Sequence, residues 1–228
     1  MTPRKKDVEP LARETIVVAA MKIIDTEGLD ALSMRRLGAE LGVNPMAAYY
    51  HVPNKAALYD LVLDAVMAGV DTSTIDGAAP LAEQMKQAAR AYRAAILEHP
   101  RAIPVLATRS VRTAAALRPV EPFLGILFAA GLTPDEALAA VDAVAHYILG
   151  GAMGYYHQEV SGEAGEQRDF EALDPAEFPH MTRVLDEGRY VGSEAEFEFG
   201  LDAIVRGLLD GPRYHLQGGR DVRRAQDP

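Results

Sequence analysis

The 228-residue chain contains no cysteine. This absence excludes disulfide bonds, thiolate metal sites and cysteine nucleophiles, although it does not by itself identify the cellular compartment. The first ten residues, MTPRKKDVEP, lack the apolar core of a signal peptide, and no apolar run reaches transmembrane length. We therefore expect a cytoplasmic protein with no membrane partner.

Sequence motifs of the common enzyme classes are absent as well. The chain has no GxSxG, no HExxH and no P-loop, and its glycine-rich run GGAMG at residues 150–154 has no strand before it. Asp142 and His146 share one face of a helix, where two ligands favour a hydrogen bond over a metal site. The sequence therefore predicts no catalytic residue, no metal site and no cofactor.

Acidic residues outnumber basic ones, and the formal net charge is −10. The excess acid lies downstream, because residues 1–60 carry 8 basic and 8 acidic residues while the remainder carries 15 and 25. The bases of the first segment gather at residues 4–6 and at Arg35, Arg36 and Lys55. An acidic body disfavours nonspecific adhesion to nucleic acid and leaves the first segment free to bind it.

Apolar residues recur at helical spacing along nearly the whole chain, with no strand-like alternation, and this pattern predicts an all-α fold. Helices are expected at about 11–27, 34–41, 45–51, 55–67, 81–99, 101–107, 123–130, 134–160, 180–186 and 193–210. Within the helix at 123–130, Phe123, Leu127 and Phe128 should face inward. The acidic stretch 161–177 is expected to be a mobile excursion.

Residues 33–55, SMRRLGAELGVNPMAAYYHVPNK, predict two short helices joined by a sharp turn. Ser33 is a candidate N-cap of the first helix, and Gly42 suits a left-handed residue at its end. Asn44 followed by Pro45 is the signature of a second helix start. This spacing indicates a helix-turn-helix, in which the second helix lies in the major groove of DNA.

The predicted second helix carries small and aromatic residues where an exposed helix usually shows Glu and Lys, and such a surface suits a groove. The alternative is an αα-hairpin buried in a helical domain, with Tyr49 and Tyr50 as core aromatics.

The turn-rich stretch DTSTIDGAAP at residues 71–80 closes the first domain. We expect a three-helix DNA-binding domain at 1–70, a helical effector-binding and dimerisation domain at 71–212, and a disordered tail at 213–228.

The segments LSMRRLGAELGV and AYYHVPNKAAL resemble the DNA-binding domain of tetracycline-repressor (TetR) family regulators, from about Leu11 to Met67. Downstream, RAAILEHPRAIPVLATRSV and AVAHYILGGAMG are similar to the effector domain of that family, up to about Asp210. The resemblance implies binding to double-stranded operator DNA and to a small effector. Because one small head engages only one half-site, we also expect a homodimer.

The resemblance also implies roles for individual residues. The positions that match DNA contacts are Arg35, Asn44, Met46, Ala47, Tyr49, Tyr50, His51 and Lys55. Thr108 and Arg109 match a Thr-Arg pair of the drug pocket, and His146 matches a histidine beside the metal–drug complex. Val105, Asp71 and Gly154 differ from the drug- and magnesium-binding residues of the family archetype, which speaks against a magnesium–tetracycline chelate.

A pocket is also indicated by the aromatic and polar groups on helices that otherwise bury aliphatic residues. The expected ligand-binding residues are Tyr92, Thr108, Arg109, Phe123, Phe128, His146 and Tyr147. The expected dimer interface lies on helices 135–160 and 193–210. Its apolar contribution is assigned to Ala145, Ile148, Ala152, Phe197, Leu201, Ile204 and Leu208.

Together these features predict a repressor that a small organic effector, bound without magnesium, releases from a palindromic operator. One alternative is a small-molecule carrier or enzyme that reuses the helical body, with the N-terminal domain as a structural cap. Another is a DNA-binding protein that needs no effector.

Overall fold

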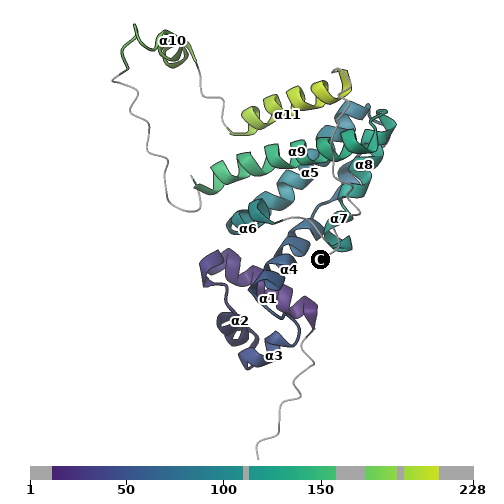
Figure 1. Ribbon diagram of the computed structural model, residues 1–228, viewed down its shortest axis with the longest axis vertical. Helices are drawn as coiled ribbons and strands as arrows, with labels where there is room; N and C mark the ends of the chain where they lie inside the picture. Colours follow the sequence, from purple (N-terminus) through teal and green to yellow (C-terminus); the bar gives the residue numbers. More distant parts are fainter. Residues whose placement is uncertain (1–11, 110–112, 158–172, 189–192, 211–228) are drawn as a thin grey trace, which may run out of the picture. The chain divides into compact units, whose positions relative to one another are not determined.

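The computed structural model of the chain describes residues 12–109, 113–157, 173–188 and 193–210 (Figure 1). Within these ranges every regular element is a helix, which confirms the all-α prediction. The basic residues 4–6, most of the acidic stretch at 161–177 and the tail at 213–228 lie outside the described residues.

The chain divides into two compact units. The first comprises Met1–Val70 and Ala94–Pro119, and the second comprises Asp71–Arg93 and Val120–Pro228. The first break falls between Val70 and Asp71, where the turn-rich stretch begins. Residues 94–119 group with the N-terminal residues, a feature that the domain boundary drawn from the sequence does not anticipate.

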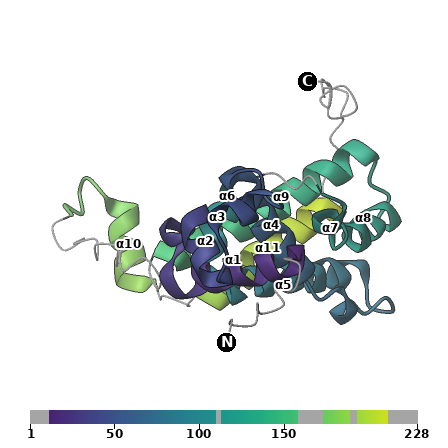
Figure 2. The ribbon, with the colours of Figure 1, turned by 90° about the horizontal axis from the view of Figure 1, so that it is seen from below.

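The first unit begins with four helices: α1 (Arg13–Glu27), α2 (Met34–Leu41), α3 (Pro45–Tyr49) and α4 (Lys55–Ala68). A 3-10 turn, η1 (Leu29–Ala31), joins the first two. Figures 1 and 2 both show α1, α2 and α3 side by side, with α2 in contact with its two neighbours. The core is aliphatic, and its fully buried side chains include Ile16, Ile23, Ile24, Leu37 and Leu58.

The same unit contains the end of α5 (Leu81–Glu98), the turn η3 (Pro100–Ala102), α6 (Ile103–Thr108) and α7 (Ala114–Leu117). Both α6 and α7 pack against α4. The long helix α4 therefore contacts the N-terminal bundle on one side and these two short helices on another.

The second unit contains η2 (Thr72–Thr74), most of α5, α8 (Val120–Ala129), α9 (Pro134–Tyr155), α10 (Pro179–Glu187) and α11 (Ser193–Asp210). Here α9 packs against both α8 and α11. Thr133 and Glu136 form a capping box at the start of α9.

Ion pairs join α5 to α11 in antiparallel register: Lys86 to Asp202, Arg90 to Glu198 and Arg93 to Glu194. The Arg93 guanidinium also lies 4.4 Å from the centroid of the Phe197 ring. Charged side chains of α5 therefore fix the register of α11, in addition to its apolar contact with α9.

Two expectations about which side chains face the core of the second unit are wrong. Phe123 and Leu127 are buried, but Phe128 is 49% exposed because it lies on the opposite face of α8. Ile148 and Leu201, assigned from the sequence to the dimer interface, are buried in the second unit. The helices α9 and α11 use these residues to pack within one chain, so they are not available to a partner.

Candidate DNA-binding surface and effector-domain residues

The turn between α2 and α3 is built by local hydrogen bonds that match its sequence signals. Ser33 Oγ accepts a hydrogen bond from the Arg36 backbone N–H at 3.1 Å and caps α2. Gly42 ends the helix in the left-handed region, with φ 66° and ψ 25°. The Val43 N–H then donates to the Gly38 carbonyl at 2.9 Å. The predicted helix start and turn are confirmed.

Gly38, in the middle of α2, contributes a close contact that the sequence analysis missed. A Cβ at this position would lie 3.1 Å from the Cα and N atoms of Pro45 and from the Val43 carbonyl oxygen. All three neighbours are backbone atoms, which cannot rotate away. The signal was present in the sequence, since a glycine inside a short helix is unfavourable unless close packing requires it.

The start of α3 also follows its sequence signal. Asn44 Oδ1 accepts a hydrogen bond from the Met46 N–H at 2.9 Å, and Pro45 occupies the first helical position. Ala48 is fully buried and anchors the helix to the bundle.

Outside this anchor, α3 and the residue after it present large apolar groups to solvent. Tyr50 is 95% exposed, Met46 is 68% exposed, and Tyr49 is also exposed. These exposures contradict the buried αα-hairpin, whose core would contain Tyr49 and Tyr50. Large exposed aromatic groups are typical of a surface that binds a partner.

The remaining candidates for DNA contact lie on the same stretch of the first unit. Arg35, Asn44, His51 and Lys55 are exposed, and Ala47 is half-buried. Lys55 follows the α4 N-cap residue Asn54, and its Nζ lies 5.3 Å from the centroid of the Tyr59 ring. The eight candidates are accessible, and their part in DNA binding stays a prediction.

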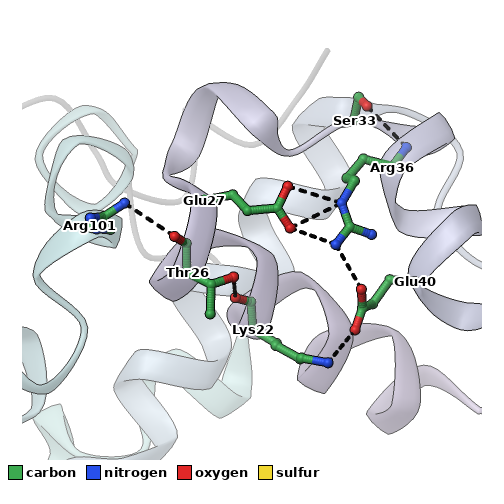
Figure 3. Close-up of polar contacts among 7 residues, drawn as sticks. All are labelled: Lys22, Thr26, Glu27, Ser33, Arg36, Glu40 and Arg101. Atoms are coloured by element: carbon green, nitrogen blue, oxygen red, sulfur yellow. Dashed lines mark hydrogen bonds and ion pairs between the residues drawn. The ribbon is translucent and has the colours of Figure 1, made fainter.

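Arg36, which the sequence groups with the bases of this motif, belongs to an ion-pair network (Figure 3). Its Nε donates to both carboxylate oxygens of Glu27, at 3.0 and 3.1 Å, and its Nη2 donates to Glu40 Oε2 at 2.8 Å. Lys22 Nζ donates to the other oxygen of Glu40 at 2.6 Å. We call these four residues, Lys22, Glu27, Arg36 and Glu40, the ionic clasp.

The ionic clasp shifts the acidity of its own members. The hydrogen bond from Arg36 lowers the pKa of Glu27, and the hydrogen bonds from Lys22 and Arg36 lower the pKa of Glu40. The side chain of Arg35, in contrast, forms no hydrogen bond or ion pair with the described residues. Two adjacent arginines therefore have different surroundings.

The seven candidates for ligand binding are divided between the units. Thr108 and Arg109 belong to the first unit, and the other five belong to the second. Thr108 Oγ1 donates to the Pro104 carbonyl of its own helix at 2.9 Å. Arg109 Nε donates to Asp60 Oδ1 on α4 at 2.7 Å.

Within the second unit, Phe123 is buried and both Phe128 and His146 are exposed. Burial raises the pKa of Tyr92 to about 12, because it disfavours the phenolate. No hydrogen bond, ion pair or ring contact joins any two of the seven candidates, all of which are described. Their role in ligand binding stays a prediction.

Tyr147 makes structural contacts with α11. Its hydroxyl donates to the carbonyls of Phe197 and Glu196, at 2.9 and 3.1 Å, and its ring stacks on Phe197 with a centroid distance of 5.8 Å. A Cβ at Gly200 would collide with the Tyr147 hydroxyl, so a side chain at this position would force Tyr147 to shift.

The positions that differ from the magnesium site of the family archetype have other surroundings here. Val105 is buried, and the Asp71 carboxylate accepts hydrogen bonds from the Ser73 hydroxyl and N–H at the start of η2. These bonds lower the pKa of Asp71. The described residues contain no group of three or more His, Cys, Asp or Glu side chains that could hold a metal ion.

Comparison with known protein families accounts for most of the chain. Residues 16–62 match the family described as bacterial regulatory proteins, tetR family. Residues 76–210 match the tetracyclin repressor-like C-terminal domain.

Individual proteins with related sequences or structures support the same assignment. The chain is 31% identical over 217 residues to the HTH-type transcriptional repressor DrrR1 of Streptomyces coeruleorubidus, covering 90% of this chain and 80% of that protein. It is 27% identical to the class G tetracycline repressor of Vibrio anguillarum, covering 87% and 93%. The structure of the TetR family protein ActR of Streptomyces coelicolor in complex with actinorhodin is similar, with a TM-score of 0.78, 31% identity, and coverage of 89% and 97%.

The capped helix-turn-helix, its exposed second helix and the helical body define a DNA-binding transcriptional regulator. The chain belongs to the TetR family.

Proposed function

We propose that the chain acts as a cytoplasmic homodimer that occupies a palindromic operator and leaves it when a small organic effector binds. Residues 1–70 form the DNA-binding domain in this proposal, and residues 71–212 bind the effector and dimerise. The observation that carries the proposal is the exposed apolar surface formed by Met46, Tyr49 and Tyr50, on a helix-turn-helix in which a side chain caps the start of each helix.

The residues of this surface suit different contacts, some with base edges and some with phosphates. Met46 and Ala47 have no hydrogen-bonding side chains and suit contact with thymine methyl groups. Asn44 uses its side-chain oxygen to cap α3, so its amide NH₂ is the group left for DNA. Arg35 suits the bidentate recognition of a guanine. Lys55, exposed at the start of α4, suits a phosphate.

The helices α9 and α11 supply an apolar surface for a second copy of the chain. Phe199 on α11 is 80% exposed, and Leu138 and Tyr155 on α9 are exposed as well. Added Cβ atoms at Gly150 and Gly154 would have no neighbour within 4 Å, so these positions allow a partner helix to approach closely.

The composition of α9 supports the same surface. Among the described residues, α9 is the one helix that is long and apolar enough to cross a membrane, by length and composition only. Only 28% of its apolar window is buried within the chain. Core helices of other proteins pass this test too. A symmetric partner would cover the remaining apolar face and hold two DNA-binding domains at a fixed separation.

A largely apolar organic effector, bound without magnesium, fits the aromatic residues of the body and the departures from the magnesium site of the archetype. The structure of ActR with actinorhodin supports an organic effector of this kind by analogy. The regulators found in the comparisons support a non-catalytic role, against a carrier or enzyme built on the same body.

A compound screen tests the proposal. Thermal shift identifies compounds that stabilise the protein, and each hit is titrated with and without EDTA and then with operator DNA obtained by footprinting upstream of the protein's own gene. An effector must bind with EDTA present. Operator DNA must weaken effector binding by the same factor by which the effector weakens operator binding. Hits whose affinity ignores the operator would contradict the release step and favour a carrier or an effector-independent DNA binder.

A further inference from the structure

We propose that Arg36 is a positioning residue for operator recognition, which holds α2 against α1 through the ionic clasp and leaves DNA contact to its neighbour Arg35. This inference rests on the proposed DNA-binding function. The resemblance places Arg35 among the DNA contacts and gives Arg36 no role, whereas the ionic clasp shows what Arg36 binds.

The ionic clasp connects α1 to both ends of α2. Glu27 is the last residue of α1 and meets Arg36 in the first turn of α2, while Lys22, one and a half turns earlier on α1, meets Glu40 in the last turn of α2. Figure 3 shows the four side chains in one continuous chain of contacts between the two helices. Two attachment points restrain the tilt and the rotation of α2 more than a single pair can.

The charges of Glu27 and Arg36 have the wrong sign for their own helices. The C-terminus of a helix favours a cation and the N-terminus favours an anion, yet α1 ends in a glutamate and α2 begins with arginines. The first turn of α2 contains no acidic residue that would offset them. The partner of Glu27 lies across the α1–α2 junction, and Arg36 has one partner there and a second, Glu40, on its own helix.

The geometry of Arg36 leaves little of its guanidinium for DNA. Its Nε and Nη2 are both engaged by carboxylates, and the two positive and two negative charges of the ionic clasp cancel. A neutral cluster contributes no net counterion release on DNA binding. Arg35 has the same unfavourable place in the first turn of α2 but no carboxylate partner among the described residues, so its charge is available to DNA.

The ionic clasp acts on recognition through α2. The position of α3 follows from that of α2, because the short turn at Gly42 and the backbone contact between Gly38 and Pro45 join the two helices rigidly. A small rotation of α2 on α1 moves both Arg35 and the exposed face of α3. Loss of the ionic clasp should therefore reduce discrimination between operator and other DNA, in addition to any effect of the substituted charge on binding to all DNA.

The test compares Glu27→Gln with Asp30→Asn in the full-length protein. Asp30 is an exposed carboxylate on η1 with no ion pair among the described residues, so both variants remove one negative charge from the same region. Charge alone predicts tighter binding to all DNA for both. The positioning role predicts that Glu27→Gln alone weakens operator binding, by about tenfold, a coupling within the range of networked residues. Equal strengthening in the two variants would overturn the proposal.

A second experiment uses the variants Arg36→Gln and Arg36→Lys. It measures their binding affinity for operator and for random-sequence DNA over a range of salt concentrations. The proposal expects Arg36→Gln to lose operator affinity with an unchanged salt slope, and Arg36→Lys to recover part of it. A salt slope reduced by about 0.9, with equal losses on both DNAs, would show that Arg36 contacts a phosphate and would overturn the proposal. A failure of the proposed function itself is separate, because wild-type protein would then show no operator preference.

If Arg36→Gln unfolds, the charge-reversed pair Glu27→Arg with Arg36→Glu is combined with Lys22→Glu and Glu40→Lys, so that every ion pair of the ionic clasp is restored with the opposite polarity. Each charge of the reversed pair then also suits its own helix end. Operator discrimination restored by this combined variant supports positioning. A well-folded reversed protein without discrimination would contradict it.

Discussion

Arg109 donates a hydrogen bond from Nε to Asp60 Oδ1 at 2.7 Å, which ties the residue after α6 to the middle of α4. The family resemblance assigns Arg109 to the ligand pocket, whereas its guanidinium contacts the helix that follows the DNA-binding motif. An effector group that accepts a hydrogen bond from Nε or Nη2 of Arg109 must compete with Asp60. The pair is therefore a candidate link between effector binding and α4.

Asp60→Asn should weaken this link. The expected result is a smaller reciprocal effect between effector and operator, below the roughly 5- to 150-fold typical of allosteric coupling, with operator binding retained when no effector is present. Calorimetric titration of a screened effector with and without operator measures it, and Asp30→Asn is the control. Coupling identical to wild type would remove Asp60 from the pathway.

Gly38→Ala should destabilise the DNA-binding unit, although alanine is the better helix former. The added Cβ would press on backbone atoms of Pro45 and Val43 at 3.1 Å. Gly125→Ala on α8 is the matched control, because its Cβ would meet nothing within 4 Å, and it should stabilise the protein by roughly 0.5–1 kcal/mol. Urea unfolding compares the free energies of unfolding of the two variants. Equal stabilisation would mean that the α2–α3 junction accommodates a Cβ at position 38.

Phe199→Glu and Leu201→Glu should fail in different ways, although they lie two residues apart on α11. Leu201 is fully buried, so a charge there should cost several kcal/mol and unfold the second unit. Phe199 is exposed in the single chain, so a charge there should leave the fold intact and dissociate the dimer. Circular dichroism and sedimentation distinguish the outcomes. A Phe199→Glu protein that remains dimeric would place the interface elsewhere.

The parts of the fold that could be predicted from sequence are those set by short-range signals. Ser33, Asn44 and Thr133 cap the helices that follow them, because capping depends on residues within one turn. Gly42 ends α2 in the left-handed region for an equally local reason. The starts of these helices and the end of α2 therefore follow from the sequence, whereas α3 ends at Tyr49, two residues before the predicted end.

The orientation of helices with two apolar faces could not be predicted in the same way. On α8 both Phe123 and Phe128 are apolar, and periodicity does not say which face meets the core. On α11 the buried Leu201 and the exposed Phe199 present the same ambiguity between an internal contact and a partner's surface. The expectation that Ile148 and Leu201 face a partner was wrong for this reason.

Long-range polar partners were also beyond the sequence. Glu27 and Arg36 lie nine residues apart on different helices, and Asp60 and Arg109 are separated by 49 residues. Each pair depends on how helices pack, which no local pattern encodes. The misplaced charges at the ends of α1 and α2 were the one visible hint, because they disfavour their own helices.

The measurement that tests the central claim most directly is equilibrium binding of wild-type and Lys55→Ala protein to an inverted-repeat operator and to random DNA, between about 50 and 200 mM salt. The account predicts a clear operator preference for the wild type and affinity that falls steeply with salt. Lys55→Ala should bind both DNAs more weakly and reduce the salt slope by about one. Affinity that is independent of salt, or equal for the two DNAs in the wild type, would contradict the assignment of the α2–α3 surface to operator recognition.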